Sequence, residues 1–192
     1  HNLYKELLNF CTVDLSSFYF DIRKDTLYCD PKDSKKRKFS LIILNIILNS
    51  LLKWFAPILS FTTEEIYQLV SKKNKSIHLE KFLNYPKKFE NFELNDKWIE
   101  LLKIRDVCNL SIEQKRAEKI IGSSLEASLK INLGKKNLNL VKSVDLAELC
   151  ITSSVEVVES NNDQIFVETT KANGEKCPVC WKINPNKCPR HD

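Results

Sequence analysis

A short cysteine-rich segment limits most strongly what this chain can fold into. It reads Cys177-Pro178-Val179-Cys180-Trp181 and then, after a short loop, Cys188-Pro189-Arg190-His191. The segment has almost no apolar residues beyond Val179, Trp181 and Ile183, so it cannot bury a core of its own. Its folding therefore needs another source of free energy, and a bound metal ion can supply it.

The two hooks, residues 177–180 and 188–191, suit Zn²⁺. Zinc takes four soft or borderline ligands in a tetrahedron, and a CxxC turn delivers two sulfurs to one ion. We therefore predict a structural zinc site with the ligands Cys177, Cys180, Cys188 and His191. Two alternatives are a disordered tail with incidental cysteines and redox chemistry at the first hook. The redox alternative is weaker, because no βαβ pattern surrounds the CxxC.

The composition describes a soluble globular protein of one domain or two small ones. The chain has 192 residues, of which 43% are hydrophobic and 29% charged. Four of the seven cysteines lie outside the hooks in apolar surroundings, which favours buried free thiols over a disulfide framework. With no secretory signal ahead of them, we expect a cytoplasmic protein without a membrane partner. Since methionine is absent, we also expect a piece of a longer protein.

The first two thirds of the chain have helical periodicity. Residues 34–55 carry the strongest pattern, and we expect a buried bundle helix that falls short of a membrane span because Asn45, Asn49 and Lys53 interrupt it. Residues 62–65 form a capping box that opens a second helix, with Thr62 as N-cap.

A third long helix is expected to begin at Asn95 or Asp96 and to end at residues 122–124. Short strands follow at 127–133, 155–158 and 165–169, with a helical turn at 144–149 and a hairpin loop at 161–163. The predicted fold is therefore mainly α. A helical bundle (1–122) precedes a small α+β region (123–172) and a C-terminal zinc module (173–192).

The residues that could perform catalysis are few. The three histidines are scattered, and Gly122, Gly134 and Gly174 cannot form a phosphate loop. The acidic pair Glu64 and Glu65 is explained by helix capping. The formal charge of +5 is concentrated at residues 32–38 and around the hooks, which suits a phosphate backbone as well as a solvated helix start. These features indicate a binding module rather than an active site.

Four strings resemble the bacterial-type isoleucyl-tRNA synthetases. Residues 14–29 (DLSSFYFDIRKDTLYC) are similar to a segment of their anticodon-binding domain, and residues 56–66 (APILSFTTEEI) to a signature shared with the valyl and leucyl class I enzymes. Residues 104–107 with 119–127 resemble a third block. Residues 177–181 resemble the closing zinc motif, although Val179 replaces an arginine and His191 stands where the family usually has cysteine.

The resemblance covers only the C-terminal part of that family. The HIGH-type turn, the KMSKS-type loop and the editing domain are absent from this sequence. It implies a parent enzyme, monomeric and cytoplasmic, that joins isoleucine to its tRNA using ATP, which this chain would not bind. The implied role of this piece, an anticodon-binding domain with a terminal zinc module, is to recognise the tRNA(Ile) anticodon stem-loop beside the rest of the synthetase chain.

RNA contacts in such a domain come from stacking side chains and cations that meet phosphates. The side chains we expect to make them are Arg23, Lys24, Lys35, Lys36, Arg37, Trp181, Lys182 and Arg190. Trp181 would either stack on a base or pack beneath the metal, and packing is the commoner fate of a tryptophan beside a metal hook. The alternative functions are the zinc-finger tail of a formamidopyrimidine-type DNA glycosylase and a free-standing tRNA-binding protein.

Overall fold

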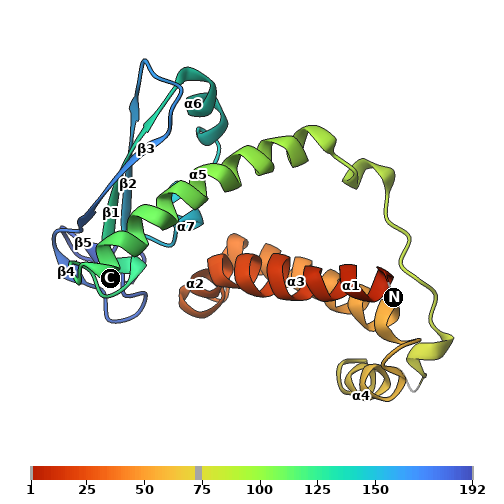
Figure 1. Ribbon diagram of the computed structural model, residues 1–192. Helices are drawn as coiled ribbons and strands as arrows, with labels where there is room; N and C mark the ends of the chain where they lie inside the picture. Colours follow the sequence, from red (N-terminus) through yellow and green to blue (C-terminus); the bar gives the residue numbers. More distant parts are fainter. Residues whose placement is uncertain (1, 72–74, 192) are drawn as a thin grey trace. The chain divides into compact units, whose positions relative to one another are not determined.

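The computed structural model describes residues 2–71 and 75–191. These residues form two compact units. Unit 1 contains residues 2–25 and 91–191, and unit 2 contains the described part of residues 26–90. The mainly α architecture with a small sheet region and a terminal Cys/His module is confirmed (Figure 1). The finer boundaries at residues 122 and 172 stay a prediction.

Unit 1 is built on a three-stranded sheet in the order β2-β1-β3. The central strand β1 (Ala127–Leu133) pairs parallel with β2 (Ser154–Glu159) and antiparallel with β3 (Phe166–Lys171). A parallel pair needs a crossover, and helices α6 (Lys135–Val141) and α7 (Leu146–Leu149) provide it.

The predicted hairpin at residues 161–163 is wrong. Strands β2 and β3 follow one another in sequence, but each pairs with β1 and they lie on opposite sides of it. The three strands themselves were predicted correctly to within a few residues. Period-2 alternation locates strands in a sequence without saying which strands pair.

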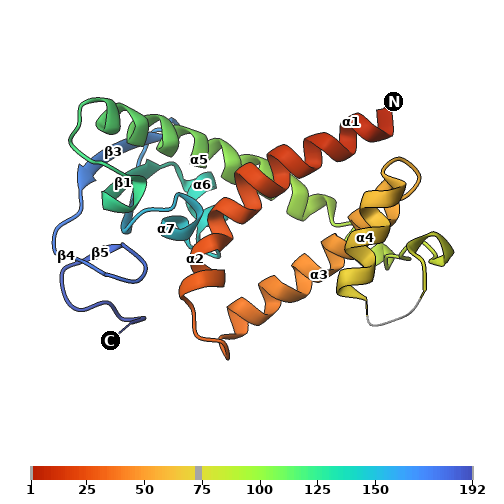
Figure 2. The same cartoon turned by 90° about the horizontal axis from the view of Figure 1, so that it is seen from below.

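Helix α5 (Phe92–Ala117) lies along one face of this sheet (Figures 1 and 2). Its N-cap is Asn91, whose side chain accepts a hydrogen bond from the backbone N–H of Leu94 at 2.9 Å. The predicted caps, Asn95 and Asp96, are wrong because Asn91 offers the same chemistry one turn earlier. The helix ends at Ala117, shortly before Lys119, whose φ of 58° is left-handed.

The core of unit 1 lies between α5 and the sheet. Alternate residues of β1 point into it, as the burial along that strand shows. The 3₁₀ turn η4 (Ser124–Glu126) leads directly into β1. The buried core residues of α5 and β1 are Leu101, Ile104, Cys108, Ile112, Ala127, Leu129, Ile131 and Leu133.

The N-terminal segment packs on the same core. Helix α1 (Asn2–Asn9), the π-helix η1 (Phe10–Phe20) and helix α2 (Asp21–Cys29) follow one another without a break. The ring of Phe18 meets Trp98 edge to face at 6.2 Å, and the guanidinium of Arg105 lies 5.4 Å from the Phe18 centroid. These contacts join the segment at 14–25 to helix α5.

Unit 2 contains helices α3 (Lys35–Phe55) and α4 (Ser60–Val70) with the 3₁₀ turns η2 (Ile77–Leu79) and η3 (Lys87–Phe89). The predicted helix at 34–55 is confirmed, and Ser34 is its N-cap. A small core joins the elements. Its buried residues are Leu52, Ala56, Tyr67 and Ile77.

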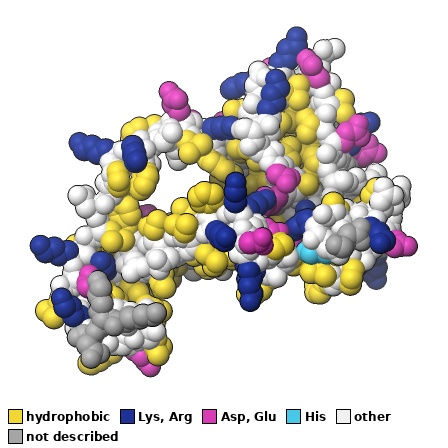
Figure 3. All heavy atoms as spheres, turned by 180° about the vertical axis from the view of Figure 1, so that it is seen from behind, with side chains coloured by type: hydrophobic (Ala, Val, Ile, Leu, Met, Phe, Trp, Pro, Cys, Tyr) yellow, Lys and Arg dark blue, Asp and Glu magenta, His cyan; other side chains and the backbone are white. Residues whose placement is uncertain are grey.

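Helix α3 was predicted to be buried, and that prediction is wrong. Phe39, Ile42, Ile43 and other apolar side chains of α3 are exposed, and Figure 3 shows apolar side chains at the molecular surface. By length and composition, however, α3 could cross a membrane, since an 18-residue window within it has a mean hydropathy of 1.4. The core helix of a soluble protein passes the same test.

The predicted capping box at 62–65 is also wrong. Helix α4 already begins at Ser60, which places Thr62 inside it. The carboxylate of Glu64 instead accepts hydrogen bonds from Ser76 Oγ and the Ile77 N–H, both at 2.8 Å. It therefore holds turn η2 rather than its own helix. The sequence also predicts a lysine-rich loop at residues 71–76, of which residues 72–74 lie outside the described residues.

Candidate metal centre

A two-stranded hairpin holds the first hook. Strand β4 (Glu175–Lys176) pairs antiparallel with β5 (Ile183–Asn184), and the hook lies between them. The Cys177 N–H donates to the Lys182 carbonyl at 2.9 Å, and the Trp181 N–H donates to the Cys177 carbonyl at 3.0 Å. The second hook closes in the same way, with the His191 N–H donating to the Cys188 carbonyl at 3.2 Å.

The four predicted ligands lie close together, although residues 181–187 separate the two hooks in the sequence. All four ligand atoms lie within 4.8 Å of one another. Cys180 Sγ is 3.8 Å from Cys188 Sγ, and His191 Nδ1 is 3.5 Å from Cys177 Sγ and 3.4 Å from Cys188 Sγ. A zinc tetrahedron has S–S edges of about 3.8 Å and S–N edges of about 3.6 Å, from ordinary Zn–S and Zn–N lengths. The donor set therefore fits zinc in its chemistry, and these three donor–donor distances are close to the edges of a zinc tetrahedron.

The environments of the two cysteines in the first hook differ. Backbone N–H groups of Cys180 and Val179, together with His191, stabilise the Cys177 thiolate and lower its pKa to about 6. Burial raises the pKa of Cys180 to about 12. Both cysteines must be thiolates to bind a metal ion. Because the N–H groups at the turn stabilise the thiolate of Cys177, this residue loses its proton more readily than Cys180.

The hairpin is attached to the sheet of unit 1. The Ile183 N–H donates to Ser153 Oγ at 2.7 Å, and the Ser153 hydroxyl donates to the Leu125 carbonyl at 2.5 Å. Lys176 Nζ lies 3.6 Å from a carboxylate oxygen of Glu126. The side chain of Ile183 is buried. The module is therefore part of unit 1 rather than a loose tail.

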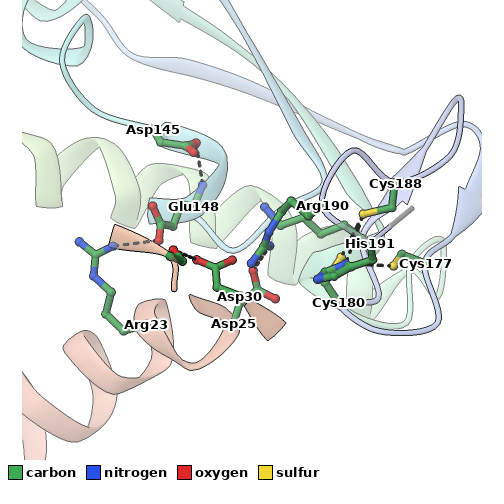
Figure 4. A network of polar contacts seen from close by, with 12 residues as sticks. Arg23, Asp25, Asp30, Asp145, Glu148, Cys177, Cys180, Cys188, Arg190 and His191 are labelled. Atoms are coloured by element: carbon green, nitrogen blue, oxygen red, sulfur yellow. Dashed lines mark hydrogen bonds and ion pairs between the residues drawn. The ribbon is translucent and has the colours of Figure 1, made fainter. Parts of the chain in front are cut away.

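Arg190 and Arg23, two of the predicted RNA contacts, are engaged within unit 1 (Figure 4). The Arg190 guanidinium is hydrogen-bonded and ion-paired with Asp25 on helix α2. Arg23 Nη1 lies 2.9 Å from Glu148 Oε1 on helix α7. The sequence placed Asp25 in a possible polar cluster near Arg23 and Lys24 but did not predict its pairing with Arg190. Glu148 was missed, because nothing distinguishes it from other surface acids along the chain.

Trp181 does not pack beneath the metal centre. It is 59% exposed and adopts a left-handed φ of 62°. The ammonium of Lys176 lies 5.8 Å from the centroid of its ring, at the distance of a cation–π contact. An exposed ring held by a fixed backbone is available to a ligand.

The other cations predicted to meet RNA are distributed over both units. In unit 1, Lys24 is exposed and pairs with Asp21 at 2.7 Å, and the Lys182 side chain is half-buried. In unit 2, Lys35 and Lys36 are exposed at the start of α3, and Arg37 Nη1 donates to the Asp30 carbonyl at 3.0 Å.

The seven cysteines form no disulfide, and all of them lie in the described part of the chain. Cys108 and Cys150 are buried in the core of unit 1, while Cys11 and Cys29 are partly buried. A hydrogen bond to Cys150, together with burial, raises the pKa of the Cys108 thiol. Both thiols of this pair are buried, which limits their access to solvent and reagents.

The family comparison covers the helical part of the chain and most of the central strand β1. Residues 1–131 match the family described as the anticodon-binding domain of tRNA ligase. This match covers more than half of the 192 residues. The chain belongs to this family of anticodon-binding domains.

The curated relatives are isoleucine–tRNA ligases. The chain is 69% identical to that of Pelagibacter ubique (strain HTCC1062), over 100% of this chain and 21% of the relative. It is 40% identical to that of Agrobacterium fabrum, over 93% and 20%, and 39% identical to that of Methylacidiphilum infernorum, over 98% and 21%. The chain thus spans about one fifth of the length of these relatives. The resemblance drawn from the four strings is confirmed, and the DNA-glycosylase and free-standing alternatives are not favoured.

Proposed function

We propose that this chain is the tRNA-recognition part of an isoleucine–tRNA ligase, which attaches isoleucine to its tRNA using ATP. The similarity to isoleucine–tRNA ligases across nearly all of the chain carries this proposal. The partners are the anticodon stem-loop of tRNA(Ile) and the remainder of a monomeric, cytoplasmic synthetase. That remainder binds ATP. The division into a helical part (1–122), a small α+β part (123–172) and a zinc module (173–192) belongs to the same proposal.

The metal in this proposal is a structural Zn²⁺ held by Cys177, Cys180, Cys188 and His191. Its support is the clustering of the four donor atoms within 4.8 Å of one another, with three donor–donor distances close to the edges of a zinc tetrahedron. When bound, zinc supplies folding free energy that the few apolar residues of the module cannot provide. The ligands themselves do not touch RNA.

The module acts on RNA through the exposed ring of Trp181. Unpaired loop bases stack on aromatic side chains, and each stacked base contributes about 1–3 kcal/mol. The ring stands at the turn of the first hook, with Lys176 over it and Lys182 beside it in sequence. Cations next to a stacking surface meet the phosphates of the same nucleotides. The exposed Lys24, Lys35 and Lys36 supply further phosphate contacts.

The test compares Trp181→Ala and Trp181→Phe with the unsubstituted protein, using an anticodon stem-loop of tRNA(Ile) as the probe. We expect Trp181→Ala to weaken binding roughly 5- to 150-fold and Trp181→Phe to retain most of it. Zinc content is measured in each variant, because the proposal requires that it stay at one ion per chain. A stem-loop with an unrelated anticodon serves as the control RNA.

Two outcomes would contradict these proposals. Unchanged stem-loop affinity in a zinc-loaded Trp181→Ala protein would exclude stacking by this ring. Equal affinity of the unsubstituted protein for the cognate and the unrelated stem-loop would exclude anticodon recognition itself. Zinc analysis of the unsubstituted protein tests the metal separately, since a chain without zinc would overturn the structural site.

A further inference from the structure

The second hook is joined to helix α2 by a side chain that lies between its two ligands. Arg190 sits inside the turn that carries Cys188 and His191, and its guanidinium pairs with the Asp25 carboxylate (Figure 4). The two side chains are only 31% and 25% exposed. An ion pair that is partly shielded from solvent is screened less by salt than a fully exposed one.

Helix α2 is a suitable anchor because its first turns are held elsewhere in unit 1. Arg23 pairs with Glu148 of α7 at 2.9 Å, and an oxygen of Asp21 lies 3.9 Å from Arg105 of α5. Arg105 also donates from Nε to the carbonyl of Leu149 at 3.0 Å. Helix α2, which carries Asp25, thus has attachments to unit 1 that do not involve the hook.

The hairpin and the second hook are attached at different places. The bonds to Ser153 and Glu126 hold the hairpin, which carries Cys177 and Cys180. Arg190 attaches the segment that carries the other two ligands. The metal centre closes only when both halves are in register, because each half provides two of the four donors.

We propose that Asp25 is a positioning residue of the metal centre, acting through Arg190. It holds the second hook where Cys188 and His191 complete the tetrahedron, so that zinc binding and the attachment of the hook to α2 strengthen one another. Such coupling is reciprocal: whatever factor Asp25 adds to zinc affinity, bound zinc adds to the stability of the Asp25–Arg190 contact. The proposal rests on the zinc site proposed above. It also assigns Arg190 to a contact within unit 1 rather than to RNA.

The experiment is a double-mutant cycle on zinc affinity, measured by competition with a chromophoric chelator. We expect Asp25→Asn and Arg190→Gln each to weaken zinc binding about fivefold, and the double variant to be no weaker than either single one. The charge-reversed pair Asp25→Arg with Arg190→Asp should restore part of the loss. Asp14→Asn is the matched control, since it removes the same charge from an exposed position on η1.

Hydrogen exchange of residues 18–25 gives a second readout that does not depend on metal affinity. Removing zinc from the unsubstituted protein should raise their exchange, whereas Asp25→Asn should show raised exchange with and without zinc. Additive single effects, or zinc affinities within twofold of the unsubstituted protein for both single variants, would overturn the proposal. Failure of stem-loop binding in every protein would instead count against the RNA function and leave the coupling standing.

Discussion

The backbone of Gly174 passes so close to Asn184 that a Cβ at this glycine would lie 1.9 Å from the Asn184 carbonyl oxygen. Its φ of 125° is also one that side-chain-bearing residues rarely adopt. The backbone of Gly174 therefore lies in close contact with that of Asn184, at the point where the chain enters the hairpin that holds the first hook.

Gly174→Ala should therefore open the hairpin and weaken metal binding. We expect a loss of at least about 2 kcal/mol, or roughly thirtyfold in zinc affinity, because folding of the module and metal binding are one equilibrium. Chelator competition measures it. Gly122→Ala is the control, since a Cβ there meets only the Glu126 side chain at 3.6 Å, and it should change zinc affinity little. Equal effects of both substitutions would argue against this close contact as the cause.

His191 should be replaceable by cysteine but not by alanine. Its Nδ1 lies at tetrahedral distance from two sulfurs, and a cysteine thiolate can occupy the same corner. His191→Ala should cost on the order of a hundredfold in zinc affinity, about one quarter of a typical structural-zinc binding free energy. Co²⁺ absorption spectra distinguish a Cys₃His from a Cys₄ centre. An unchanged Co²⁺ spectrum in His191→Cys would remove His191 from the ligand set.

Glu64 should make the turn at residues 76–79 sensitive to acid. Hydrogen bonds from Gln68, the Ile77 N–H and Ser76 lower the pKa of this carboxyl below its ordinary value of 4.5. A lowered pKa in the folded state means that ionised Glu64 stabilises the turn above about pH 4.5, and that this contribution disappears as pH falls through the lowered value.

The amide protection factor of Ile77, followed by NMR between pH 7 and pH 3, measures this effect. At pH 7 Glu64→Gln should reduce the protection, and the difference from the unsubstituted protein should vanish toward pH 3. Glu65→Gln changes the neighbouring exposed carboxyl and should leave the protection unaltered. A difference that persists at pH 3 would show that the charge of Glu64 is not responsible.

Leu101 and Leu110 should respond very differently to the same substitution on the same helix. Leu101 is fully buried in the core of unit 1, whereas Leu110 is 66% exposed. Leu101→Ala should destabilise the protein by about 2–5 kcal/mol through lost burial and a cavity, and Leu110→Ala by less than about 1 kcal/mol. Urea unfolding gives both values. A comparable loss at Leu110 would mean that another surface covers this face of α5 in solution.

Hydrophobic periodicity and the spacing of metal ligands were the two sequence signals that gave most of the correct structural predictions. The apolar spacing along residues 34–55 located α3, and the hooks located the Cys/His cluster, because each signal is local. The exposure of α3 could not be predicted, because the sequence of an apolar helix is the same whether or not another element covers it. The cap at Asn91 and the role of Glu64 were missed for a related reason. A side chain that can cap has several candidate backbone groups within reach, and tertiary structure selects one.

Pairing of strands and of charges was the other part that sequence could not reveal. Asp25 and Arg190 meet across most of the chain, and β2 and β3 meet β1 rather than each other. Such contacts depend on how distant segments are brought together, for which a single sequence carries no local signal.

Unit 1 is assembled from two stretches of chain that are separated by all of unit 2. During synthesis, Phe18 and Ile22 therefore leave the ribosome well before Trp98 and the β1 residues that cover them. Unit 2 is contiguous, so its elements have all emerged before unit 1 can be completed. The ligand hook that meets Asp25 is synthesised later than β1. The apolar side chains of Phe18 and Ile22 therefore stay exposed until partners about eighty residues later in the sequence have been translated, and in that interval they can bind a chaperone.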